Sequence, residues 1–193
     1  MFYTKLRVRC PSQDLEESAA AVVRALSEQA DHSLWGMWQG LFGVPSDQLI
    51  LMTQHERGAS ALKLPDGIEA LEQHNLRATA RPTSAQPEKR RGVYVFRTFA
   101  TYRDHIDEIV QLSSEAWQTF ESGKDYEALP VGLFAPVEPA ATCAMHLLTW
   151  YPDFTAWQNS RNSDPQALRR FAARRALTTS TVAIATRSLV SDL

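Results

Sequence analysis

His146 is the residue whose type and position best suit proton transfer. It lies inside an apolar run with the character of a buried strand, where an imidazole needs a hydrogen-bond partner. Its ring titrates near neutral pH, as a general acid or base must. The first half of the chain has Ile50 at the matching position. We therefore take His146 as a candidate catalytic residue, with a hydrogen-bonded core histidine as the alternative.

Basic side chains gather on four expected strands that contain no Asp or Glu. The strands are residues 3–10, 76–83, 93–102 and 180–190. Their bases are Lys5, Arg7, Arg9, Arg77, Arg81, Arg97 and Arg187. An arginine keeps its charge, so each one that faces a low-dielectric interior needs an anion or several hydrogen-bond acceptors.

Alternation along these strands predicts where the arginines point. Leu6, Val8 and Phe96 are expected to face the helices, which would turn the bases toward the interior on the opposite side of the sheet. We expect a cleft there that accepts a carboxylate or a similar anionic group. Its expected ligand-binding residues are Arg97, Arg187, Arg7 and Arg81. The alternative is that these arginines bond to backbone carbonyls or loop carboxylates and fix how the sheets meet.

Trp150 is the tryptophan placed to share a cavity with His146, because it lies two strand repeats away on the same face. It could contact an aromatic or lipid-like ligand, although core packing is the commoner use of tryptophan. Two arginine pairs, at 169–170 and 174–175, make one expected helix basic. Nucleic acid is one interpretation of this helix. The absence of interleaved aromatic residues favours a solvated face instead.

Composition and motif searches exclude several classes of protein. The chain is 44% hydrophobic and 22% charged, with a net charge of −2, so no positive field for nucleic acid or an anionic membrane is expected. There is no phosphate-binding glycine loop, nucleophile elbow or His/Cys cluster. We therefore expect no metal and no cofactor. The two separated cysteines, Cys10 and Cys143, and the lack of a signal or a long apolar run predict a cytoplasmic protein without membrane insertion.

The sequence contains one pattern twice. Gly40-Leu41-Phe42 with Pro45 precedes an apolar run ending at Thr53, and Gly132-Leu133-Phe134 with Pro136 precedes one ending at Thr149. Leu6-Arg7 and Phe96-Arg97 begin the two copies in the same way. A near-constant offset between such landmarks indicates a duplication.

Each copy reads as β-α-β-β-α-β, the ferredoxin-like order. The expected units are residues 1–84 and 92–193, with a linker at 85–91. In the first unit, Pro65 to Leu71 is expected to form the second helix. A four-stranded sheet with helices on one face needs its other face covered. The predicted fold is therefore α+β, with two tandem ferredoxin-like units packed sheet to sheet as an intrachain α+β barrel of the dimeric type.

Four segments of the second half resemble the NIPSNAP family of the dimeric α+β barrel superfamily. They are Gly92–Phe99, Met145–Tyr151, Trp157–Arg161 and Thr186–Leu189. The first half is similar more faintly. Where that family's first strand often carries an acid and a tyrosine, this chain has Val95 and Phe99. The resemblance implies the barrel fold and self-association, whereas its superfamily includes cofactor-independent monooxygenases, haem-dependent enzymes and small-ligand lyases.

Three functions remain open at this stage. The first is binding or transformation of a small organic molecule, anionic or aromatic, by His146 and the strand arginines. The second is a non-catalytic scaffold or protein-interaction module. The third is a haem-binding or cofactor-independent monooxygenase-like barrel, which for haem requires a histidine reachable from a large open cavity.

Overall fold

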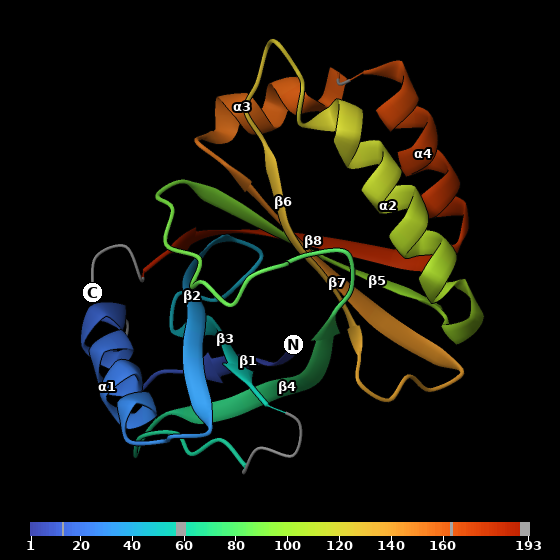
Figure 1. The fold of residues 1–193 in the computed structure, drawn as a ribbon. Coiled ribbons are helices and arrows are strands. Elements are labelled where there is room, and N and C mark those ends of the chain that lie inside the picture. The colour runs from blue at the N-terminus through green and yellow to red at the C-terminus, as the bar shows by residue number, and fades with distance from the viewer. Residues whose placement is uncertain (13, 57–60, 163, 190–193) are drawn as a thin grey trace. The chain divides into compact units, whose positions relative to one another are not determined.

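The chain forms two compact units in a computed structural model that describes residues 1–12, 14–56, 61–162 and 164–189 (Figure 1). The first unit contains Met1–Arg77, Ser84–Arg91 and the described residues from Ile184 onward; the second contains Ala78–Thr83 and Gly92–Ala183. Residues 85–91, expected as a linker, therefore group with the first unit. Ser163 and residues 190–193, which fall within the second expected unit, lie outside the described residues.

The first unit has one helix and an antiparallel sheet. Its elements are β1 (Phe2–Arg9), α1 (Leu15–Ser27), β2 (His32–Phe42), β3 (Gln48–His55) and β4 (Glu69–Ala78), whose last residue belongs to the second unit. The strand order β4-β1-β3-β2 is ferredoxin-like, and the end of β8 pairs with β2. Asp14 caps α1 by accepting hydrogen bonds from the amides of Glu16 and Glu17. The apolar stripe of α1 packs on Leu6, Val8, Leu49 and Leu51 of the sheet.

The second unit has helices after its first and third strands. Its elements are β5 (Val93–Tyr102), the short 3₁₀ turn η1 (Arg103–His105), α2 (Ile106–Phe120), β6 (Leu129–Pro136), β7 (Thr142–Tyr151), α3 (Phe154–Asn159), the 3₁₀ turn η2 (Ser160–Asn162), α4 (Pro165–Ala176) and β8 (Thr178–Ser188). The strand order β8-β5-β7-β6 is again ferredoxin-like, with Ala183 the last residue of β8 in this unit. The mixed α+β fold with two ferredoxin-like units is thus confirmed, whereas the packing of one unit on the other stays a prediction.

The second helix predicted for the first unit is wrong. Residues 69–71, the end of the predicted helix, open strand β4, and the described residues 61–68 form no helix. Leu62, Leu64 and Ile68 of this segment pack in or against the core. These tertiary contacts, rather than the helical spacing of the apolar residues, determine its conformation. The longer β4 also brings two acids, Glu69 and Glu72, into a strand that was expected to have none.

No helix within the described parts of the chain is long and apolar enough to cross a membrane.

Candidate functional site

Strand β5 turns Arg97 toward the helices of the second unit. Val95, Arg97 and Phe99 alternate onto the face that also carries Trp117 of α2 and Phe171 of α4 in one pocket lining. The prediction that Phe96 faces the helices and Arg97 the opposite side is therefore wrong. Residues 93–96 are all buried, so both faces of β5 are apolar and alternation alone did not decide between them.

The structural register explains this error. Leu6 pairs with Leu51 in the first unit, and Arg97 pairs with Leu147 in the second. Leu51 and Leu147 are equivalent core positions 96 residues apart (147 − 51), as are Thr53 and Thr149 (149 − 53). Arg97 is therefore the counterpart of Leu6 rather than of Arg7, an offset of 91 (97 − 6) in place of 90. A slip of one residue moves every side chain of a strand to the other face.

Helix α4 and turn η2 bring three more arginines to this face. Asp164 caps α4 by accepting hydrogen bonds from the amides of Gln166 and Ala167, and Pro165 occupies its first turn. The buried Ala167, the half-buried Phe171 and Arg174 follow at i, i+4 and i+7, so Arg174 lies on the apolar stripe of α4. Arg175 and Arg161 also line the pocket.

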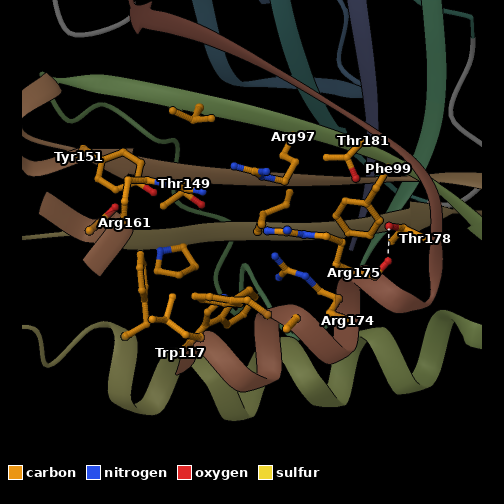
Figure 2. Close-up of a pocket in the computed structure, with 18 residues that line it drawn as sticks. Arg97, Phe99, Trp117, Thr149, Tyr151, Arg161, Arg174, Arg175, Thr178 and Thr181 are labelled. Atoms are coloured by element: carbon orange, nitrogen blue, oxygen red, sulfur yellow. Dashed lines mark hydrogen bonds between the residues drawn. The ribbon is translucent and has the colours of Figure 1, made fainter. Parts of the chain in front are cut away.

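These elements enclose a pocket of about 400 Å³, within the range of small-molecule sites. Figure 2 shows Arg161 beside Tyr151 and Thr149 at one end, Arg174 and Arg175 beside Phe99 and Thr178 at the other, and Arg97 between them. The apolar part of the lining includes Trp117, Phe120, Pro130, Leu147, Leu168 and Phe171. No Asp or Glu is among the described lining residues. The pocket therefore combines apolar walls with four cationic side chains.

Burial and mutual repulsion oppose the charges of two of these arginines. Burial, with Arg97 and Arg175 nearby, lowers the pKa of Arg174 to about 10. Burial lowers the pKa of Arg97, and Arg161 and Arg175 lower it further. Both side chains stay cationic at neutral pH, and an anion in the pocket would relieve their repulsion.

Arg174 and Arg97 differ in their protein contacts. Arg174 donates a hydrogen bond to the Ser113 hydroxyl at 3.1 Å, and its guanidinium lies 5.0 Å from the ring centre of Phe171. Among the described residues, Arg97 has no carboxylate, carbonyl or hydroxyl within hydrogen-bond distance. The donors of Arg97 are thus available to a ligand, whereas one donor of Arg174 is already used by Ser113.

Tyr151 supplies a neutral hydrogen-bonding group at the Arg161 end. Burial raises the pKa of its phenol, while a hydrogen bond with Ser160 and the charges of Arg97 and Arg161 oppose that rise. The phenol therefore keeps its proton at neutral pH.

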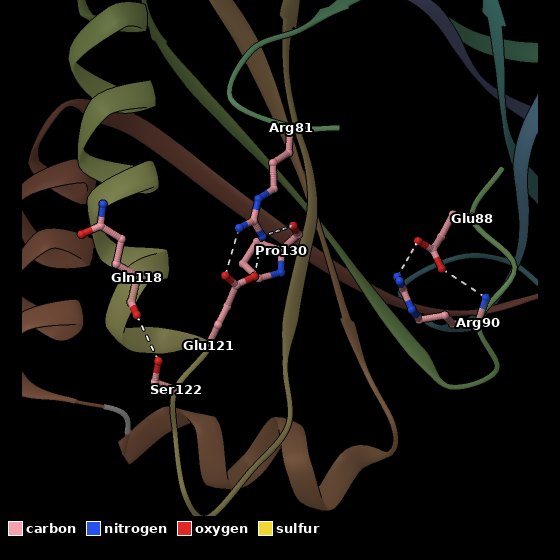
Figure 3. Close-up of polar contacts among 7 residues, drawn as sticks. All are labelled: Arg81, Glu88, Arg90, Gln118, Glu121, Ser122 and Pro130. Carbon is pink, nitrogen blue, oxygen red and sulfur yellow. Dashed lines mark hydrogen bonds and ion pairs between the residues drawn. The ribbon is translucent and has the colours of Figure 1, made fainter. Parts of the chain in front are cut away.

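Arg81 supports the wall of the pocket without lining it. Its guanidinium pairs with both carboxylate oxygens of Glu121, one of them at 3.0 Å, and donates to the Pro130 carbonyl at 3.1 Å (Figure 3). It also lies 5.1 Å from the ring centre of Trp117. Arg81 therefore holds two lining residues, Trp117 and Pro130, in place. It is not the free anion ligand expected from the sequence.

The other predicted ligand-binding arginines belong to the first unit and already have partners there. Arg7 pairs with Glu72 at 3.2 Å, and the Arg187 side chain donates two hydrogen bonds to the Gln39 amide oxygen, at 3.2 and 3.0 Å. These contacts favour the structural alternative for both residues. The partner of Arg7 is Glu72 of β4, a residue that sequence analysis placed between the expected helix and the expected strand.

His146 is buried, as expected, but it does not line the pocket. Its Nδ1 lies 3.1 Å from the Thr98 hydroxyl, on the face of the sheet opposite Arg97 and Leu147. Trp150 alternates onto the same opposite face and is also absent from the lining. The structure therefore does not bring His146 and Trp150 together with Arg97. The catalytic role of His146 stays a prediction.

Sequence analysis missed four residues of the site: Arg161, Arg174, Arg175 and Tyr151. It assigned the arginines of α4 to a solvated face, which holds for the exposed Arg169 but not for Arg174. The spacing Ala167, Phe171, Arg174 was a signal that could have placed Arg174 on the buried stripe. Arg161 ends one of the segments that resemble the NIPSNAP family, but it lies in a 3₁₀ turn, where no helical or strand periodicity predicts the direction of its side chain.

The lining does not fit haem or a metal ion. It contains no histidine or cysteine, and its one phenol, Tyr151, has a raised pKa that disfavours ligation as a phenolate. No group of three His, Cys, Asp or Glu side chains is placed to hold a metal among the residues that the structure describes.

Comparison with known proteins identifies the fold. Neither a protein-family model nor a curated protein sequence matches this chain. A solved anthrone oxidase-like protein is 10% identical over 97% of this chain and 91% of its own, with a TM-score of 0.64. A major regulator of staphylococcal pathogenesis is 10% identical over 95% of this chain and 98% of its own, with a TM-score of 0.58.

An uncharacterized ferredoxin fold protein related to antibiotic biosynthesis monooxygenases, from Listeria monocytogenes 4b F2365, is 10% identical over 97% of this chain and 94% of its own, with a TM-score of 0.55. At these identities the likeness shows the fold alone. The shared fold is the ferredoxin-like arrangement of strands and helices seen in the two units. Because one fold here carries both an oxidase-like protein and a regulator, the function must be argued from the site.

Proposed function

We propose that the second unit binds a small organic acid, with an apolar or aromatic body, in the pocket between β5, β7, α2 and α4. The observation that carries this proposal is Arg97, a half-buried arginine without a described partner at a position where the first unit has the core residue Leu6. Three further arginines and no acid line the same pocket.

Electrostatics gives the physical reason. Charges attract more strongly inside a cavity walled by protein than in water, and a guanidinium binds a carboxylate through paired hydrogen bonds. Trp117, Phe120 and Phe171 offer ring surfaces to the body of the ligand. A fold neighbour is called anthrone oxidase-like, and anthrone is a polycyclic aromatic compound, so aromatic acids are the first class to test.

Thermal unfolding with a panel of acids tests the proposal, because a ligand that binds only the native state must raise Tm. The panel pairs 2-naphthoate, benzoate and octanoate with neutral compounds of the same shape, such as 2-naphthalenemethanol. We expect at least one acid to raise Tm while its neutral counterpart does not.

Two variants locate the binding site. Arg97→Leu should abolish the rise in Tm, because it removes the guanidinium that pairs with the acid. Leucine is the replacement because the first unit has Leu6 at the equivalent position. Arg169→Gln should keep it, because Arg169 is an exposed arginine of α4 that is absent from the pocket lining. The proposal fails if no acid stabilises the protein, or if the acid stabilises the Arg97→Leu variant equally.

Three further proposals rest on the sequence. We propose that the chain belongs to the NIPSNAP family, acts in the cytoplasm and associates with copies of itself. The resemblance of residues 92–99 and 145–151 supports the first, and the two free cysteines, Cys10 and Cys143, fit the reducing compartment that the second requires. Light scattering on the purified protein tests the third, which a monomer at all concentrations would contradict.

A further inference from the structure

The cations of the pocket are spread along the strands rather than gathered at one point. Tyr151 pairs with Val93 of β5, whereas Phe99 lies six residues further along the same strand. The hydrogen bond between Ser160 and Tyr151 fixes turn η2 beside the Val93–Tyr151 pair. The end of α4 is fixed near the other end of β5, beyond Phe99, where the Thr101 hydroxyl donates a hydrogen bond to the Leu177 carbonyl at 2.7 Å.

This anchoring separates the arginines of η2 from those of α4. Arg161 acts electrostatically on Tyr151 and Arg97, whereas the charges that act on Arg174 are those of Arg97 and Arg175. The two ends are therefore an Arg161–Tyr151 end and an Arg174–Arg175 end, with Arg97 between them (Figure 2).

Apolar side chains lie between the two ends. Leu147 pairs with Arg97 at the middle of β5, and Trp117, Phe120 and Phe171 line the pocket from α2 and α4. A ligand with one acidic group could satisfy one end only. With the acid at the Arg161 end, the half-buried Arg174 would keep its charge beside apolar walls, which is unfavourable, and the exposed Arg161 would have no ligand partner with the acid at the other end.

We infer that the ligand is an elongated dianion whose two acidic groups lie at opposite ends of an apolar or aromatic body. This inference rests on the proposed function and adds the number and placement of the acidic groups. A ligand of this kind pairs each end of the pocket with one anion and leaves Arg97 to bond to either of them.

Three naphthalene acids separate this arrangement from a single cationic cluster. The 2,6-dicarboxylate carries its acids at opposite ends, the 2,3-dicarboxylate carries them side by side, and 2-naphthoate carries one. Titration calorimetry should give the 2,6-isomer an affinity about tenfold or more above 2-naphthoate, since a second charge-assisted contact is worth at least that factor. The 2,3-isomer has the same charge and should lack most of this gain.

Variants at the two ends provide a second test. Arg161→Gln and the double variant Arg174→Gln/Arg175→Gln should each reduce the ratio of 2,6-dicarboxylate to 2-naphthoate affinity to about one, because each removes the arginines of one end and one acid then has no partner there. The exposed Arg169 again offers the control, and Arg169→Gln should keep the ratio. A ratio, unlike an affinity, does not change when a variant only loosens the whole pocket.

Two outcomes would overturn the inference and are distinguishable from each other. If 2-naphthoate binds but the 2,6-isomer binds no better, or the 2,3-isomer binds best, the two-ended arrangement is wrong and the proposed function stands. If none of the three acids binds, both are wrong.

Discussion

The two units have the same strand order but fill the space over their sheets differently. In the first, α1 and the extended segment 61–68 pack Leu6 and its neighbours into an apolar core. In the second, α2 and α4 cover β5 and β7, and a pocket of about 400 Å³ surrounds Arg97 at the position equivalent to Leu6. The comparison teaches that, of two units with the same strand order, one can keep a closed core while the other gives up packing for a charged cavity.

Of the two exchanges between Leu6 and Arg97, the one in the first unit should change stability most. Leu6→Arg places a charge in a site that is 2% exposed and removes the leucine from the core. We expect a loss of about 4 kcal/mol or more in the free energy of unfolding, measured by urea denaturation. A loss below about 1 kcal/mol would show that the first unit also accommodates a charge at this position.

The reverse exchange should stabilise the second unit. Arg97→Leu removes the repulsion with Arg161 and Arg175 and the cost of burying the guanidinium. We expect a gain of about 1–2 kcal/mol in the same urea experiment without ligand, in line with other replacements of buried charges by apolar residues. A loss of stability would mean that Arg97 has a structural role.

Alkaline pH should affect the buried Tyr3 of the first unit more than the buried Tyr151 of the second. Burial raises the pKa of Tyr3 to about 12. The folded protein therefore holds this proton more tightly than the unfolded chain, so stability present below pH 10 is lost as the pH rises from 10 through 12. The loss is at most about 1.4 kcal/mol per pH unit.

Phenylalanine variants measure each contribution. Tyr3→Phe should flatten the fall in urea stability between pH 10 and 11. Tyr151→Phe should flatten it less, because Arg97 and Arg161 oppose the rise in the pKa of Tyr151. Equal effects of the two variants would contradict the electrostatic difference between the units.

Ion pairs of the two units give the smallest expected effects. Glu121→Gln weakens a partly buried pair with Arg81 that supports Trp117 and Pro130, and should cost about 1 kcal/mol. Glu69→Gln weakens the more exposed Arg9–Glu69 pair of the first unit and should cost about 0.3 kcal/mol. Urea denaturation should give the larger loss of unfolding free energy for Glu121→Gln. A larger loss for Glu69→Gln would contradict this prediction.

Much of the fold was predictable because local patterns and tertiary packing agree in most elements. The stripe of α1 and the run of β3 each allow one assignment. The segment after Pro65 was not predictable, because its apolar residues fit a helix and are used instead by an extended chain and the start of β4. The choice between an extended connection and a short helix depends here on contacts with the core, which the local sequence does not reveal.

The site was predicted only in part. The scarcity of acids near Arg97 predicts an anion site there, but the face on which Arg97 lies depends on a one-residue register, which the apolar residues on both faces of β5 leave open. Arg161 and Tyr151 meet only through the hydrogen bond between Ser160 and Tyr151, a contact between elements that pattern analysis cannot supply.

Arginine side-chain NMR tests the central claim most directly, because each guanidinium gives its own Nε–Hε signal. Arg97→Leu and Arg7→Gln spectra assign the two signals to be compared, one in each unit. On titration with 2-naphthoate, the Arg97 signal should shift saturably while the Arg7 signal, paired with Glu72, stays in place. An unmoved Arg97 signal under conditions where calorimetry shows binding would contradict the account.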